Sequence, residues 1–240
     1  MPPVSYAVRN AYEALYSALE EASAAANCGI VKINRPLNAC FSTVSPVEAK
    51  FDCYVHLKEW NYRGGSSKRP IHILLRAQEQ IHHSEHVLSK SSVRVSYFKV
   101  QNNQAQLLQN VHYDYAPGDD NSAQGQEAHP LFHAQVNNEP LHPPLSNAED
   151  LEFKFEIQPS AQPWFNHARI PTSDMSFPSV LLCLAADHFE AQFFHDFYRK
   201  VCDCQAKMPH PRFDPLRQRL SCEPQHFRSS QWFKPPATGA

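Results

Sequence analysis

The feature that most constrains the fold is a series of short segments in which apolar and polar residues alternate. In the first of them, apolar side chains occupy every second position from Phe51 through Cys53 and Val55 to Leu57. Side chains of a strand point alternately to its two faces, so this period of two predicts a strand with one buried face.

Five further segments have the alternation or the composition of strands. They span residues 71–77, 93–100, 106–115, 131–136 and 153–157. Helix-forming residues after Arg76 keep a helix over 69–86 open as the alternative to a strand there. Successive strands with short turns predict a meandering antiparallel sheet of about five to seven strands.

A helix is predicted before this sheet, over residues 5–27. Its apolar side chains recur at helical spacing and form one stripe: Val8, Tyr12, Leu15, Leu19, Ala22 and Ala26. We expect the stripe to pack on the domain's own core, with a seam for a partner helix as the alternative. Ser5 is the expected N-cap, and Gly29 is expected to close the C-terminus.

A second helix is predicted after the sheet. It begins at Ser176, the expected N-cap, and Met208-Pro209 ends it. Its apolar stripe consists of Leu182, Phe189, Phe193, Phe197 and Val201. The predicted fold class is therefore α+β, an antiparallel meandering sheet packed on one face by an N-terminal and a C-terminal helix.

Composition indicates the domain organisation of the chain and its cellular compartment. Of the 240 residues, 42% are hydrophobic, and we expect one α+β domain over 1–206 with a Pro-rich, basic-aromatic extension over 207–240. The formal net charge of −2 gives no whole-chain attraction to nucleic acid or to a membrane. Seven cysteines without a CxxC pair, and no apolar signal segment at the N-terminus, predict a reduced, cytoplasmic protein without a membrane partner.

The common catalytic signatures are absent, since the chain has no GxxxxGK[ST], GxGxxG, GxSxG or HExxH pattern. The strongest positive signal in this histidine-rich chain is His112-Tyr113-Asp114, because residues i and i+2 of a strand face the same way. His133 on the next predicted strand, or His129 just before it, could supply a third ligand. Imidazoles and a carboxylate on one face form a candidate Fe(II) or Zn(II) site.

The same His-x-Asp pattern, with the distal His167 and the nearby Arg169, resembles the facial triad of Fe(II)/2-oxoglutarate oxygenases. The resemblance covers these four residues, and Arg169 follows the histidine more closely than in that family. It implies an Fe(II)-dependent enzyme in which His112, Asp114 and His167 hold the metal.

Other interpretations of this region need no metal. The imidazoles and Asp114 could decorate a solvated sheet face while Tyr113 and Tyr115 alternate into the core. They could line a pocket for a small ligand. Asp114 could also orient an imidazole that acts as a general base.

A second polar cluster, formed by Glu79, His82, His83 and His86, falls in the segment whose secondary structure is ambiguous. On a helix, Glu79 and His82 would share a face with His86 and could bind a metal. The spacing of Arg76 and His82 is similar to the loose R-x(4–6)-H pattern of HEPN-type ribonucleases, which place it on a long helix. On a strand, these residues would instead belong to a charged hairpin tip.

The C-terminal extension interleaves basic and aromatic residues, which suits contact with phosphates, bases or an acidic protein. The candidate partner-binding residues are Arg212, Arg217, Arg219, Phe227, Arg228, Trp232 and Phe233. Docking of these aromatics on the chain's own domain is the alternative. Cys202 and Cys204 with Cys222, His210 or His226 are a further candidate zinc site.

Two classes of function follow. The first, which we favour, is a non-enzymatic interaction protein that binds a protein partner, or a protein–nucleic acid partner, through its N-terminal helix and basic-aromatic tail. The missing motifs and the low glycine count support it, because close backbone approach to a ligand often uses glycine. The second is a metal-dependent enzyme with a His-x-Asp…His site that holds Fe(II) or Zn. A ribonuclease-like R-x5-H site is a further alternative.

Overall fold

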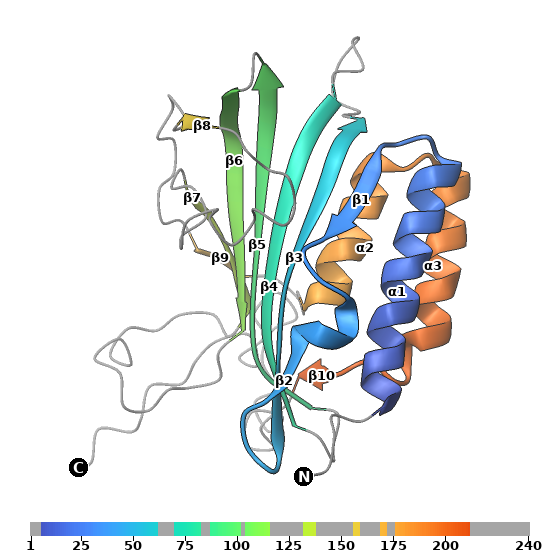
Figure 1. Cartoon of the computed structure of the whole chain (residues 1–240), viewed down its shortest axis with the longest axis vertical. Coiled ribbons are helices and arrows are strands. Elements are labelled where there is room, and N and C mark those ends of the chain that lie inside the picture. The colour runs from blue at the N-terminus through green and yellow to red at the C-terminus, as the bar shows by residue number, and fades with distance from the viewer. Residues whose placement is uncertain are drawn as a thin grey trace, which may run out of the picture.

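The computed structural model describes residues 6–61, 70–82, 87–101, 104–115, 132–137, 156–158, 169–171 and 176–211. Within these residues the strands form one sheet, and the three α-helices lie on one side of it (Figure 1). The fold is thus α+β, with an antiparallel sheet covered by an N-terminal helix and C-terminal helices, which confirms the predicted class.

Four long strands form the centre of the sheet, and each pairs antiparallel with the next. They are β3 (Glu48–Asn61), β4 (Pro70–His82), β5 (Val87–Gln101) and β6 (Gln104–Tyr115). Strands β1 (Ile30–Ile33), β7 (Phe132–Asn137) and β9 (Arg169–Pro171) extend it, so the main path runs β1-β3-β4-β5-β6-β7-β9. The segment 70–82 is a strand, which settles the ambiguity left by the sequence.

The alternation in the sequence skips one position at Tyr97-Phe98, and the register of β5 against β6 shifts between these two residues. The extra residue of this irregularity is Leu108 of β6, because β5 pairs regularly with β4 through Ile73↔Tyr97 and His72↔Phe98. Phe98 therefore lies on the face opposite the helices, where it is 0% exposed, so the skip in the sequence marks apolar burial on the second face of β5.

Several short strands were not predicted, because two to four residues are too few to show a period. Strand β2 (Phe41–Thr43) and the 3₁₀ helix η1 (Leu37–Cys40) come from the Pro-punctuated segment 30–50. Strand β10 (His210–Pro211) pairs in parallel with the start of β5. Strand β8 (Glu156–Gln158) pairs in parallel with β6, away from the main path, and the rest of the predicted strand 153–157 lies outside the described residues.

Helix α1 (Tyr6–Ala25) buries its predicted stripe in the core, where Tyr12 and Leu19 are both 0% exposed. The stripe is therefore used by the chain's own core and is not a seam for a partner helix. The expectation that Gly29 closes this helix is wrong. Asn27 adopts the left-handed conformation at φ 46°, and Cys28 N donates to Ser23 O at 3.0 Å in a Schellman arrangement.

Gly29 is needed for a different reason. Its φ of 132° is unfavourable for other residues, and a Cβ there would lie 2.4 Å from the carbonyl oxygen of Lys58. The glycine thus lets the chain after α1 pass close to strand β3, next to the register shift between Leu57 and Trp60.

The C-terminal segment forms two helices rather than the one predicted, α2 (Phe177–His188) and α3 (Ala191–Gln205). The backbone is extended at Phe189 (φ −87°, ψ 150°) and at Glu190 (φ −66°, ψ 154°), so the helix cannot continue. The Phe189 ring is 1% exposed and lies 5.3 Å from the ring of Trp60, centroid to centroid. Its burial against the sheet accompanies the break.

The core between sheet and helices is rich in aromatic rings. Tyr12 of α1 contacts Phe51 of β3 edge-on with centroids 4.8 Å apart, and it stacks on Phe177 of α2 at 5.7 Å. Such contacts add specific geometry to the apolar burial that holds the layers together. Among the described helices, none has the length and apolar character needed to cross a bilayer.

Candidate functional site

His112 and Asp114 lie on the sheet face opposite the helices. Alternation along β6 places Tyr115 (2% exposed) and Tyr113 on the other face, against the hydrophobic core, as predicted. The side chains of His112 and Asp114 are 15% and 25% exposed, and His112 Nε2 lies 2.9 Å from Asp114 Oδ1. The two residues therefore converge, as their spacing indicated.

Ser92 of β5 completes this group, with its Oγ 2.8 Å from the same Nε2 of His112. A bare Nε2 lone pair would face the Asp114 carboxylate unfavourably, so the hydrogen-bond network assigns the proton to Nε2. His112 then donates toward both neighbours and cannot accept the Ser92 proton. A catalytic serine triad instead needs serine and carboxylate on opposite ring nitrogens, so this group lacks that geometry.

The candidates for a third metal ligand are His133, His129 and His167. His133 on β7 is the register partner of Asp114, but its side chain is not among the described ones. His129 and His167 lie outside the described residues. In the part of the chain that the structure describes, no group of three or more His, Cys, Asp or Glu side chains could hold a metal ion.

A second polar network on the same face centres on Asp52 of β3. Its carboxylate accepts a hydrogen bond from Gln78 Nε2 at 2.9 Å and lies 3.1 Å from Lys50 Nζ. Arg76 Nε lies 3.8 Å away, and its guanidinium sits 5.1 Å above the centroid of the Tyr54 ring. The Asp52 carboxylate is thus shared by two basic side chains and one amide within the face.

Because residues 70–82 form strand β4, Arg76 and His82 do not have the helical spacing of the ribonuclease pattern. Six residues of strand separate them by about 20 Å, whereas the ribonuclease pattern needs them on one helix. The metal-binding helix face proposed for Glu79 and His82 is wrong for the same reason, because Glu79 packs among core residues under the helices while His82 is only partly buried. His83 and His86 lie outside the described residues.

Glu79 has a structural function that the sequence did not reveal. It is 1% exposed, and its Oε1 accepts hydrogen bonds from the backbone N of Phe177 at 2.7 Å and from Ser91 Oγ at 3.1 Å. Its Oε2 accepts one from the Tyr12 hydroxyl at 2.5 Å. Ser176 occupies the N-cap position of α2 but makes no capping bond, so the predicted serine cap is replaced by a carboxylate from the sheet.

A buried histidine pair was also missed. His56 of β3 and His72 of β4 are 2% and 6% exposed, and His56 Nε2 lies 3.0 Å from His72 Nδ1. Burial lowers the pKa of His72 below its ordinary value. Both residues sit at alternating positions of strands predicted from the sequence, but nothing in their spacing signals that they meet.

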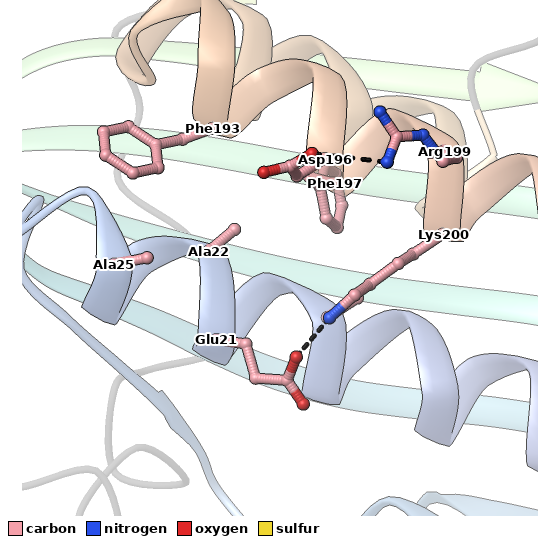
Figure 2. A pocket seen from close by; sticks show the side chains of 9 residues that line it. Glu21, Ala22, Ala25, Phe193, Asp196, Phe197, Arg199 and Lys200 are labelled. Carbon is pink, nitrogen blue, oxygen red and sulfur yellow. Dashed lines mark hydrogen bonds and ion pairs between the residues drawn. The ribbon is translucent and has the colours of Figure 1, made fainter.

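The helical layer contains a groove of about 350 Å³ between α1 and α3. Figure 2 shows Ala22 and Ala25 of α1 facing Phe193 and Phe197 of α3. Lys200 reaches from α3 to the Glu21 carboxylate of α1. Small alanines leave room between the helices, so the groove has an apolar floor and a charged rim.

The remaining sequence candidates are in the C-terminal part. Cys202 and Cys204 both lie on α3, where residues two apart do not face each other, so the helix does not present them to one metal ion. All seven candidate partner-binding residues of the tail, from Arg212 to Phe233, lie outside the described residues.

Comparisons with protein-family models, with curated proteins and with solved structures gave no match to this chain.

Proposed function

We propose that the protein is a non-enzymatic interaction protein of the cytoplasm that binds a protein partner through the helical layer and the basic-aromatic tail. The observation that carries the proposal is the groove between α1 and α3. Its apolar floor and charged rim resemble the apolar core and polar rim of protein interfaces.

The contribution of α1 comes from its exposed edge, since its apolar stripe is buried. Ala25 is exposed and lines the groove, whereas the adjacent Ala24 is exposed but does not line it. Ala25→Arg should therefore block a side chain that enters the groove, and Ala24→Arg is a matched control on the same helix turn. Both substitutions leave the core untouched.

The test is quantitative affinity capture with the intact chain, repeated with the purified partner. We expect Ala25→Arg to weaken binding about tenfold or more, which corresponds to about 1.4 kcal/mol, and Ala24→Arg to leave it unchanged. Equal binding by the two variants would remove the groove from the proposal.

The tail is tested separately. Truncation after Pro211 retains every described element, and it should weaken partner binding without lowering the melting temperature. A truncated chain that unfolds would assign the tail a structural function. Replacing Arg212, Arg217 and Arg219 together by glutamine should flatten the salt dependence of any nucleic-acid binding, and an unchanged slope would exclude nucleic acid as the tail's partner.

A metal-dependent enzyme is the second candidate. It is favoured by one observation, that Asp114 contacts His112 and has His133 as its register partner. Elemental analysis of protein purified without a histidine tag tests it. Near-stoichiometric Fe or Zn that is lost in a His112→Ala, Asp114→Ala variant would replace the binding proposal with this one.

A further inference from the structure

The helical layer that contains the groove is acidic, although the net charge of the whole chain is small. Over residues 6–25 and 177–205, seven acidic residues stand against three basic ones. Of the basic residues, Arg199 and Lys200 already form ion pairs with acids of the groove rim. All seven acidic residues are exposed, namely Glu13, Glu20, Glu21, Asp187, Glu190, Asp196 and Asp203. The surface around the groove is therefore net negative.

The ion pairs of the rim leave its carboxylates accessible to other cations. Arg199 Nη1 lies 3.6 Å from Asp196 Oδ1, and the two side chains are 75% and 67% exposed. The Lys200 and Glu21 side chains are 49% and 66% exposed. Exposed pairs of this kind contribute little to stability, so a cation from a second molecule can replace Lys200 or Arg199 at small cost.

The floor of the groove suits an aromatic side chain. Phe197 is 0% exposed, whereas Phe193 is only partly buried and lines the groove with Ala22 and Ala25 (Figure 2). The volume of about 350 Å³ lies near the lower end of pockets that hold small ligands, about 300–1,000 Å³. An inserted ring would contact the Phe193 ring, a pairing that aromatic side chains favour. The groove thus fits a segment that carries aromatic rings beside cations.

The C-terminal tail of the chain contains such a segment. Arg228 directly follows Phe227, Lys234 directly follows Trp232 and Phe233, and residues 225–240 contain no acidic residue. The tail as a whole, over 212–240, has five basic residues against two acidic ones. The groove and the tail, both assigned above to partner binding, are therefore complementary to each other in charge and in apolar character.

We propose that the groove of one copy binds segment 227–234 of a second copy, so that the protein self-associates head to tail. The inference rests on the proposed function and names its partner as a second copy of this chain. Residues 212–231, which connect this segment to the fold, include Pro215 and Pro224 and no glycine. Prolines stiffen and extend a connection, which favours contact with a second copy over return to the same one. Because the groove and the tail are different surfaces, the contact can continue into larger assemblies.

The experiment is sedimentation velocity of the purified full chain, without a tag, over a series of concentrations. We expect the parent to form assemblies larger than a monomer as its concentration rises. Ala25→Arg, which blocks the groove, and Trp232→Ser, Phe233→Ser, which removes the anchors of the tail, should each raise the dissociation constant about tenfold or more. Ala24→Arg adds the same charge outside the groove and should associate as the parent does. Melting temperatures verify that each variant is folded.

Mixing the two defective proteins tests the complementarity directly. The Ala25→Arg protein keeps its tail, and the Trp232→Ser, Phe233→Ser protein keeps its groove. Each should be monomeric alone at a concentration at which the mixture forms a one-to-one complex. Absence of that complex would overturn the head-to-tail contact, and so would equal self-association by the parent and the Ala25→Arg variant.

Failure of this proposal is distinguishable from failure of the proposed function, because self-association is measured on one purified protein. A parent that stays monomeric, including one whose tail fills its own groove, overturns the second-copy proposal alone. Capture of a different protein that is insensitive to Ala25→Arg overturns the role of the groove in the proposed function.

Discussion

Replacing Glu79 by alanine should remove a carboxylate that joins three elements of the fold. Three buried donors lose their acceptor at once, namely the Tyr12 hydroxyl, Ser91 Oγ and the backbone N of Phe177. Each buried donor left unsatisfied costs about 1–3 kcal/mol. Because relaxation offsets part of this, we expect the free energy of unfolding to fall by about 3–6 kcal/mol, a large part of the roughly 5–15 kcal/mol of an ordinary domain.

Glutamine at position 79 provides a graded comparison. Its carbonyl oxygen can still accept from Ser91 and Phe177, and its amide can donate to the Tyr12 hydroxyl, so chiefly the charge is lost. We expect Glu79→Gln to cost about 1–2 kcal/mol, which is the extra strength of a charge-assisted bond. The order of stability should then be parent, Glu79→Gln, Glu79→Ala.

The assay is equilibrium unfolding in urea, followed by tryptophan fluorescence and by far-ultraviolet circular dichroism. Glu21→Ala on α1 is the matched control, since that carboxylate is 66% exposed and makes a surface ion pair with Lys200. Its effect should stay within about 0.5 kcal/mol. A Glu79→Ala variant whose stability lies within about 1 kcal/mol of the parent would refute the argument that this carboxylate holds α2 on the sheet.

Three other predictions follow from described geometry. Burial lowers the pKa of His72, so its stabilising contribution is present above its ordinary pKa and is lost as the pH falls through its lower folded pKa. The free energy of unfolding in urea should therefore fall less between about pH 7.5 and about pH 5 in His72→Gln than in the parent. An equal fall in both proteins would contradict the lowered pKa of His72. Gly29→Ala should cost about 2 kcal/mol or more, because its Cβ would meet the Lys58 carbonyl at 2.4 Å and its φ is 132°; a melting temperature equal to the parent's would count against this. In the native protein, a maleimide should label exposed Cys202 and spare Cys53. Cys53 is 0% exposed, and burial raises the pKa of its thiol well above the ordinary value. Mass spectrometry of tryptic peptides measures the labelling, and labelling of Cys53 before Cys202 would contradict this prediction.

Strands with several alternating residues were predictable because burial of one face imposes a period of two. The same rule placed Tyr115 in the core and His112 on the opposite face. Short edge strands such as β1 and β9 left no such trace, because their four and three residues are too few to show a period.

The break between α2 and α3 and the cap of α2 depend on contacts between distant parts of the chain. Phe189 leaves the helix to be buried near Trp60, and Glu79 reaches Phe177 across 98 positions of sequence. Neither contact has a local signature. The local rules instead favoured a continuous helix with Ser176 as its cap.

The candidate site was predictable within one strand but not between strands. Residues i and i+2 of one strand had to converge, so His112 and Asp114 were found. The contribution of Ser92 and the row of Arg76, Arg94 and His112 depend on the register between strands. Several registers preserve the same alternation, so sequence periodicity does not select among them.

The most direct test of the proposed function is site-specific photo-cross-linking from the groove between α1 and α3. A benzophenone-bearing residue at position 25 lines the groove, and the same residue at position 24 is the neighbouring exposed control. We expect one discrete cross-linked partner protein from position 25 and little from position 24. Equal adduct yields at the two positions, or no adduct from position 25 while the partner is still captured, would contradict the proposed binding in the groove.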